Sequence, residues 1–185
     1  MEVMMDWIKI FNSCLEEIKN KYHTYHFYCE RDIVWTIQRS IAEYIHQNKL
    51  PYKIINDYPI EGGERRSKSV DLAVVSIDVN DFDVLNGKAK AELVVEFKYE
   101  PSKMRKNEIC IHKLPVVSWQ GVLEDIDRVH RFVSNEKSKR SIAILIDEFG
   151  RFMTPNHIVY GSEWIEWKNC NSKEFKISIL YTEVK

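Results

Sequence analysis

Three charged residues interrupt two of the most hydrophobic segments of the chain. Asp71 lies in the run 70–77 (VDLAVVSI), and Glu96 and Lys98 lie in the run 92–100 (ELVVEFKYE). Runs of this kind, rich in β-branched residues, predict strands that are buried on both faces. Residues i and i+2 of a strand share a face, so Glu96 and Lys98 point the same way about 7 Å apart. If the two strands are neighbours, Asp71 lies about 5 Å from either Glu96 or Lys98 on the adjacent strand.

Two carboxylates buried this close together are unfavourable, because each loses its hydration and the two repel each other. A divalent cation removes both penalties, and oxygen ligands with retained waters are what Mg²⁺ prefers. The spacing therefore points to a Mg²⁺ or Mn²⁺ site at Asp71 and Glu96. A simpler alternative is an ion pair of Asp71 or Glu96 with Lys98 that only neutralises a buried sheet.

The Glu-x-Lys spacing is not specific by itself, because the sequence contains it five times. Glu96 and Lys98 differ from the other pairs in lying inside a strand of the buried type, with an aspartate in the strand before. A competing candidate combines Asp147, at the end of the segment 140–147, with Glu166 and Lys168. A long irregular segment containing Gly and Pro separates these residues, which makes this site the weaker hypothesis.

A further acid, Glu30, lies near the start of a helix predicted over residues 29–48. It precedes Ile33 and Ile37 by three and seven residues, so it belongs to the inward stripe of that helix. Glu43 lies on the outer face of the same helix and is interpreted as solvated surface. The alternative for Glu30 is an acid of the first turn that the helix dipole favours.

The remaining segments complete an α/β fold, a mixed central sheet flanked by helices, in a single domain of residues 1–185. Apolar spacing predicts helices over the first 22 residues and over 119–133. Runs of β-type residues predict strands at 52–58, 70–77, 92–100 and 140–147, and a last, edge-type strand at 176–184. The expected core is about 29–147, with an N-terminal helix extension (1–28) and a C-terminal sheet extension (148–185).

The connection between the two charged strands decides whether their acids meet. A two-residue turn at Asn86-Gly87 would place Asp71 opposite position 102, beyond Lys98. We therefore predict an irregular connection between about residues 79 and 89, which brings Asp71 opposite the segment 96–98.

This order of elements resembles the PD-(D/E)xK nuclease superfamily, which has the restriction-endonuclease-like fold with an αβββαβ core. The resemblance covers about residues 29–147 and rests on Glu30, Asp71 and the segment 96–98 (EFK). Val70 stands where the motif has a proline, at a position that coordinates nothing.

The next helix offers a weaker point of similarity. Gln120 opens it and resembles the glutamine of the RecB-type branch, but Glu124 occupies the place of that branch's tyrosine. The chain looks most like an uncharacterised bacterial branch of the superfamily.

The resemblance implies Mg²⁺-dependent hydrolysis of phosphodiester bonds in nucleic acid, with DNA as the expected substrate. Asp71 and Glu96 would hold the ion, with the Phe97 carbonyl as a further ligand and Glu30 reaching a water or a second ion. Because two carboxylates lie close to Lys98, we expect a raised pKa for Lys98 and a charged, orienting role rather than that of a general base. The alternative is a non-catalytic module that binds nucleic acid or protein on the same fold.

The charge of the whole chain excludes a protein that coats nucleic acid through bulk charge. The 185 residues carry a formal net charge of -1. Locally, the segments 64–68 and 98–113 carry net charges of +2 and +3 and flank the proposed acids. Contacts to the phosphate backbone are therefore expected from basic residues of these segments, with Gln120 as a further substrate contact: Arg65, Arg66, Lys68, Lys103 and Arg105.

Composition and cysteine spacing narrow the class of protein further. A hydrophobic fraction of 44% with 12% aromatic residues excludes a disordered chain. The four cysteines are too widely spaced for a metal knuckle, and no apolar run approaches the roughly 18 residues of a membrane span. We expect a cytoplasmic protein with reduced thiols and no membrane partner, and a homodimer is left open.

Overall fold

The computed structural model describes residues 5–59, 69–102, 117–167 and 177–185. Its centre is a six-stranded sheet with the order β1-β2-β3-β4-β6-β5, in which β3 and β4 run parallel and the other neighbours antiparallel. The expected mixed α/β fold is confirmed. Along the chain the elements are α1 (Trp7–Lys21), the 3-10 turn η1 (Tyr22–Thr24), α2 (Glu30–Gln47), β1 (Tyr52–Pro59), β2 (Ser69–Ser76), α3 (Asp81–Leu85), β3 (Leu93–Glu100), α5 (Trp119–Ser134), β4 (Ser141–Glu148), β5 (Ser162–Trp167) and β6 (Ile177–Val184).

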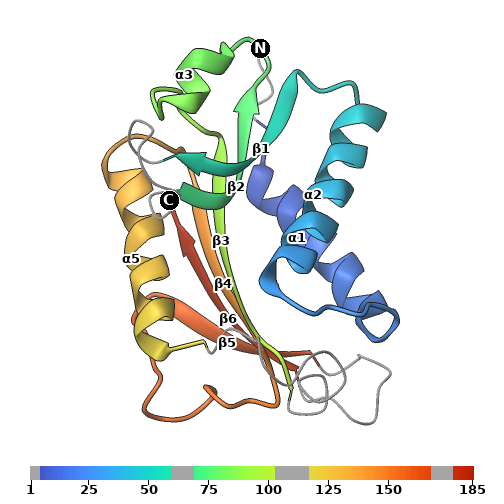
Figure 1. The fold of residues 1–185 in the computed structure, drawn as a ribbon, viewed down its shortest axis with the longest axis vertical. Helices are drawn as coiled ribbons and strands as arrows, with labels where there is room; N and C mark the ends of the chain where they lie inside the picture. Colours follow the sequence, from blue (N-terminus) through green and yellow to red (C-terminus); the bar gives the residue numbers. More distant parts are fainter. Residues whose placement is uncertain (1–4, 60–68, 103–116, 168–176) are drawn as a thin grey trace.

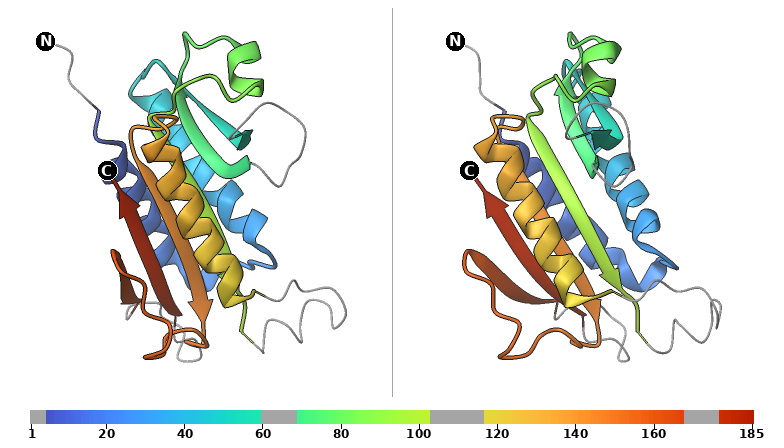
Figure 2. Two further views of the ribbon diagram at one scale, coloured as in Figure 1. Left: turned by 90° about the vertical axis from the view of Figure 1, so that its left-hand side faces the viewer. Right: turned by 60° about the vertical axis from the view of Figure 1, so that its left-hand side comes forward.

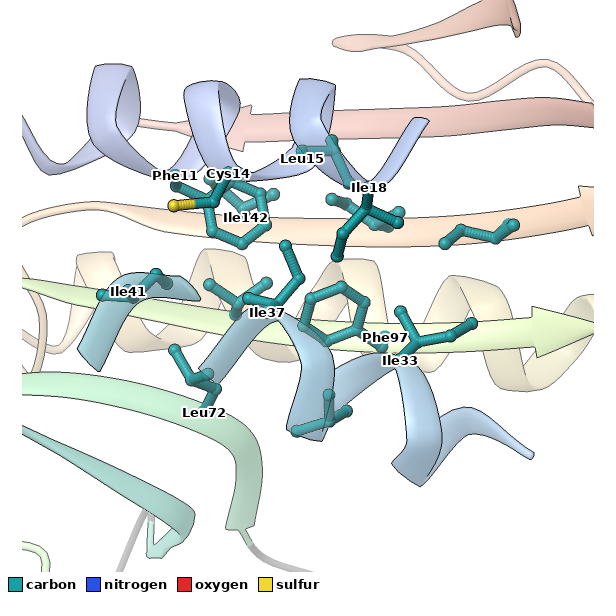
Figure 3. Packing of buried hydrophobic residues seen from close by; sticks show 14 of the residues in the cluster. Phe11, Cys14, Leu15, Ile18, Ile33, Ile37, Ile41, Leu72, Phe97 and Ile142 are labelled. Carbon is teal, nitrogen blue, oxygen red and sulfur yellow. The ribbon is translucent and has the colours of Figure 1, made fainter. Parts of the chain in front are cut away.

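The larger core lies between the sheet and helices α1 and α2, which cover one of its faces (Figures 1 and 2). Ile33, Ile37 and Ile41 recur at helical spacing on α2 and point toward Phe97 of β3 and the side chains of α1 (Figure 3). Truncating one of these buried side chains, as in Ile37→Ala, would destabilise the fold by about 2–5 kcal/mol. This stripe fixes α2 against the sheet and so fixes the position of its first residue, Glu30.

The start of α2 is set by local capping. The Asp32 carboxylate accepts hydrogen bonds from the N–H groups of Tyr28, at 2.7 Å, and Cys29, at 2.9 Å. These bonds supply partners for N–H groups that precede the first helical turn. The helix therefore begins at Glu30, and its end at Gln47 agrees with the exclusion of helix directly before Pro51.

Helix α5 covers the opposite face of the sheet (Figure 2). Ser118 caps it by accepting a hydrogen bond from the Gly121 N–H at 3.0 Å. Its apolar stripe packs against residues of β4 and β6. Asp125 lies on this stripe, three residues after Val122 and four before Val129, and is buried with them.

The register of β2 and β3 confirms the predicted irregular connection. Leu72 pairs with Val95 and Val74 pairs with Leu93, so Asp71 comes opposite Glu96. The connection contains the short helix α3, and no two-residue turn at Asn86-Gly87 joins the strands. The charged strands are therefore placed as the hypothesis of a common site requires.

The C-terminal part of the prediction was wrong in two respects. The expected edge strand, β6, lies inside the sheet between β4 and β5. The edge on that side is β5, a strand that the sequence analysis left in an irregular segment. The alternation of apolar and polar residues along a strand indicates which side chains are buried. It does not indicate whether another strand pairs with the backbone on one side or on both sides.

In the part of the chain that the structure describes, no helix combines the length and the apolar character needed to cross a bilayer.

Candidate functional site

The candidate site lies where β2 and β3 part. Their pairing is limited to Leu72–Val74 with Leu93–Val95, and β3 continues beyond it (Figure 1). Here two carboxylates accept bonds from backbone donors: Asp71 Oδ2 from the Phe97 N–H at 2.7 Å, and Glu96 Oε2 from the Asp71 N–H at 3.2 Å. Because buried N–H groups need acceptors, one role of the two acids is to end the ladder.

Lys98 is contacted by acids from both faces of the sheet. Its Nζ lies 3.5 Å from Glu30 Oε2 of α2 and 2.7 Å from Asp125 Oδ2 of α5. The parting of the strands leaves room for Glu30 to approach past the edge of β3. The alternative in which Lys98 pairs with Asp71 or Glu96 is therefore wrong in its choice of partners, although Lys98 does form ion pairs.

Glu96 is paired with an arginine that the sequence analysis did not single out. Arg128 Nη1 of α5 donates to Glu96 Oε1 and lies 3.4 Å from Asp125 Oδ1. The side chain of Glu96 is only 2% exposed and that of Arg128 is 22% exposed. This pair is largely shielded from water, so the charge of Glu96 depends strongly on its partners.

The site contains more acidic than basic side chains. It combines four carboxylates and two cations, which leave a formal net charge of −2 when all are ionised: Glu30, Asp71, Glu96 and Asp125 with Lys98 and Arg128. Burial raises the pKa of Glu30 to about 7, and Asp71 and Asp125 add to the rise while Lys98 opposes it. Burial, with Asp71 and Asp125, likewise raises the pKa of Glu96 well above its ordinary value, against the effect of Arg128. Both raised pKa values indicate that the two cations do not fully offset the burial and mutual repulsion of these carboxylates.

Lys98 is held in its protonated form. Burial by itself would lower the pKa of the ammonium group, but the negative charges of Asp125 and Glu30 outweigh it and raise that pKa above its ordinary value. The predicted direction of the shift is confirmed. Asp125, which was not part of the prediction, is the largest of the causes that raise this pKa.

The donor set fits a hard divalent cation by atom type and by charge. Carboxylate oxygens are the ligands that Mg²⁺ takes, and the excess of two negative charges equals the charge of one such ion. Among the described residues, however, no group of three or more His, Cys, Asp or Glu side chains is arranged so that it could hold a metal ion. Asp71 and Glu96, which face each other across the parting strands, are the residues that would hold an ion, with Glu30 next to them.

Asp125 and Arg128 are the site residues that the sequence analysis missed. Both belong to a strongly amphipathic helix, where charged residues are usually on the solvent face. Their positions along the helix could have identified them, because Asp125 has the same helical spacing as the apolar residues that face the sheet, and Arg128 lies three residues after Asp125. An acid in the inward phase of α5 is comparable to Glu30 in the inward phase of α2.

Other predicted contacts are not brought to these acids. Gln120 is exposed, and its side chain donates to Glu124 at 3.2 Å. The predicted phosphate contacts lie outside the described residues: Arg65, Arg66, Lys68, Lys103 and Arg105.

The competing site around Asp147 has a different structural explanation. Asp147 is fully buried, and its Oδ2 accepts a hydrogen bond from the Phe152 N–H at 2.7 Å, which fixes the turn after β4. Glu166 is exposed on the edge strand β5, and Lys168 lies outside the described residues. The Asp147 carboxylate is thus engaged in holding a loop.

Two hollows open on either side of Glu30 and Arg31. The larger, of about 410 Å³, includes Tyr28 and Lys98 in its lining, and the smaller, of about 90 Å³, includes Trp35 and Asp71. The acids and the lysine can therefore be approached from solvent along the start of α2.

Comparison of the chain with family models, with curated proteins and with solved structures finds no match in any of the three.

Proposed function

We propose that this protein hydrolyses phosphodiester bonds in nucleic acid with the help of a divalent metal ion, and that DNA is its substrate. The observation that carries the proposal is a largely buried cluster of four carboxyl groups with only two cations, a formal net charge of −2 when all are ionised. Uncompensated carboxylates destabilise a fold, so a site of this kind fits a role in which a cation is bound.

The fold is consistent with the resemblance to the PD-(D/E)xK superfamily. The elements α2, β1, β2, β3, α5 and β4 follow the expected order, with α3 as an addition between β2 and β3. Asp71 lies opposite Glu96, and Glu30 approaches Lys98 from the start of α2. This agreement in position supports a restriction-endonuclease-like core as part of the proposal.

Each side chain then has a distinct role. Asp71 and Glu96 would bind Mg²⁺ or Mn²⁺. When bound, such an ion polarises the scissile phosphate and makes water a stronger nucleophile at neutral pH. Lys98 remains charged and orients the phosphate or stabilises the charge that develops on it. Asp125 is proposed as a positioning residue, because its carboxylate lies 2.7 Å from the Lys98 ammonium group.

A second candidate function is a module that binds nucleic acid or protein without catalysis. It is favoured by one specific observation, the pairing of Arg128 with Glu96. If this pair and the backbone bonds of Asp71 and Glu96 were the whole purpose of the acids, the cluster would serve stability alone. The excess of two negative charges is what this alternative leaves unexplained.

A cleavage panel separates the two functions. Single-stranded, duplex and branched DNA and single-stranded RNA are incubated with the protein in EDTA, Mg²⁺ or Mn²⁺. We expect cutting that depends on the metal and is lost in Glu96→Gln, whereas Glu124→Gln on the exposed side of α5 removes the same charge and retains activity. Absence of metal-dependent cutting across the panel would contradict the enzyme and favour the binding module.

Metal binding can be measured independently of cleavage. The shift in melting temperature with Mg²⁺ or Mn²⁺ is expected for the wild type and for Glu124→Gln, because binding to the folded state alone raises stability. Glu96→Gln should respond less. An equal response of Glu96→Gln and the wild type would show that the ion binds elsewhere.

A further inference from the structure

The face of α2 next to the candidate site alternates aromatic and basic side chains. Tyr28 lies two residues before the first helical residue, Arg31 follows three residues later and Trp35 four residues after that. This spacing places Arg31 and Trp35 on one face of the helix, away from the inward stripe of Ile33 and Ile37. The face is not part of the fold's core.

Both aromatic side chains are unusually open to solvent. Tyr28 is 48% exposed and Trp35 is 56% exposed. Within the described ranges, neither ring packs against another aromatic ring, and Arg31 forms no ion pair or hydrogen bond through its side chain. Large aromatic residues with this exposure contribute little to stability, and their free faces are available to a ligand.

This face is continuous with the acids and Lys98. Tyr28 and Arg31 line the same hollow of about 410 Å³ as Lys98, and Arg31 and Trp35 line the same hollow of about 90 Å³ as Asp71. A third hollow, of about 600 Å³ between α1 and α2, is lined by both Tyr28 and Trp35 and leads away from the site. Its volume falls within the range of about 300–1,000 Å³ that is usual for ligand sites.

We propose that Tyr28, Arg31 and Trp35 bind the unpaired nucleotides of a single strand next to the scissile phosphate. This inference rests on the proposed function and names its substrate class. An aromatic ring can stack on a base only where that base has an open face, which is the case in a single strand and not inside a duplex. Arg31 lies between the two aromatic residues in the sequence and has no acidic partner among the described residues, so it would contact the phosphate that joins the stacked nucleotides.

The spacing suits more than one nucleotide. The five helical steps from Glu30 to Trp35 correspond to a rise of about 7.5 Å, and Tyr28 lies two residues before Glu30. Stacked bases of one strand are about 3.4 Å apart, so Tyr28 and Trp35 can engage different bases of the same strand. A duplex offers this face only its phosphates. The geometry therefore favours single-stranded nucleic acid, or the unpaired end of a duplex, over a continuous double helix.

Equilibrium binding in EDTA tests the inference without involving cleavage. Fluorescence anisotropy is measured with labelled oligothymidylate and with a blunt duplex of the same length. We expect the single strand to bind at least about tenfold more tightly, and Tyr28→Ala and Trp35→Ala each to weaken single-strand binding by about tenfold while changing duplex binding by less than about twofold. Trp35→Phe should restore most of the affinity, because it restores the stacking face.

Two controls make the result specific. Arg31→Gln should weaken binding of both probes and reduce the dependence of log Kd on log salt by about one, as expected for a lost phosphate contact. Tyr160→Ala removes a fully exposed aromatic ring that lines none of the three hollows, and should leave affinity unchanged. Urea unfolding of each variant confirms that the exposed substitutions leave the fold intact.

Equal affinity for the two probes would overturn the inference, and so would alanine variants that bind the single strand as well as the wild type. If neither oligonucleotide binds, the inference is also overturned and the face is left to a protein partner. If the single strand binds through Tyr28 and Trp35 but no probe is cut with Mg²⁺ or Mn²⁺, the inference stands and the proposed hydrolysis is refuted.

Discussion

The carboxyl group of Glu30 should give the stability of this protein an unusual dependence on pH. Burial, together with Asp71 and Asp125, raises its pKa from 4.5 to about 7 in the folded state. Between these two values the folded protein still holds a proton that the unfolded chain has released. Stability therefore decreases as pH rises from about 4.5 to about 7, and it is constant with respect to this group outside that window.

The size of the effect follows from the shift and the exposure. A shift from 4.5 to about 7 corresponds to about 3 kcal/mol, at about 1.4 kcal/mol for each pH unit. The side chain of Glu30 is 33% exposed, so solvent screening reduces the expected effect to about 1–2 kcal/mol. Glu30→Gln keeps the size of the side chain and removes the titration. It should match the wild type below pH 4.5 and be about 1–2 kcal/mol more stable above pH 7.

Urea unfolding in EDTA, at constant ionic strength and over this range of pH, measures the difference directly. Glu96, Asp125 and Asp147 also have raised pKa values, but they are present in both proteins and largely cancel in the comparison. Glu43→Gln is the matched control, because it removes a carboxylate from the exposed face of the same helix. Its pH profile should run parallel to that of the wild type.

Two results would refute the reasoning. If Glu30→Gln is less stable than the wild type above pH 7, the attraction between Glu30 and Lys98 outweighs burial and repulsion. If the difference between the two proteins does not vary with pH, Glu30 titrates alike in the folded and unfolded states. In either case the cluster would carry no uncompensated charge at Glu30, and the main support for a bound cation would be weakened.

Three further predictions concern the cations and the ion. Arg128→Met leaves the buried Glu96 without its arginine partner, so it should lower the free energy of unfolding in EDTA by about 2–3 kcal/mol. Saturating Mg²⁺ should restore part of this loss. Equal losses with and without Mg²⁺ in urea unfolding would contradict the prediction. Asp125→Asn removes the nearest acid from Lys98, so single-turnover cleavage should fall by about tenfold to a hundredfold while oligonucleotide affinity stays within about twofold; a parallel loss of affinity would assign Asp125 to substrate binding instead. Mg²⁺ should raise the melting temperature of the wild type more at pH 8 than at pH 5, because the raised pKa values leave fewer ionised carboxylates at the lower pH; the reverse order would exclude this cluster as the metal site.

The central part of the fold could be predicted because two kinds of signal agree there. Hydrophobic runs located β2, β3 and β4, and the position of Asp71 relative to Glu96 required a connection longer than a tight turn. The structure has that register and places α3 in the connection. The prediction succeeded because a two-residue turn would have placed Asp71 opposite position 102, so only a longer connection could bring it opposite the segment 96–98.

Other parts could not be derived from the same signals. The strand β5 is only six residues long and follows an irregular segment, and the strand pattern of β6 does not reveal that β5 pairs with its outer side. Asp125 and Arg128 could have been found from their positions on the inward side of α5. Their ion-pair partners, however, depend on which strand lies beneath the helix. That information comes from the tertiary arrangement and not from the helix itself.

The backbone role of Asp71 and Glu96 and their proposed chemical role are not in competition. Ending the ladder between β2 and β3 requires two acceptors for two N–H groups, and the neutral amides of Asn and Gln would provide them without repulsion. The chain has carboxylates there instead, adds Glu30 and Asp125 from two helices, and supplies only Lys98 and Arg128 as counter-charges. Structural need accounts for oxygen acceptors at these positions, but it does not account for four carboxyl groups beside only two cations. Residues that lower stability in this way are expected where a protein binds a ligand, and we propose that the ligand that compensates them here is a divalent cation.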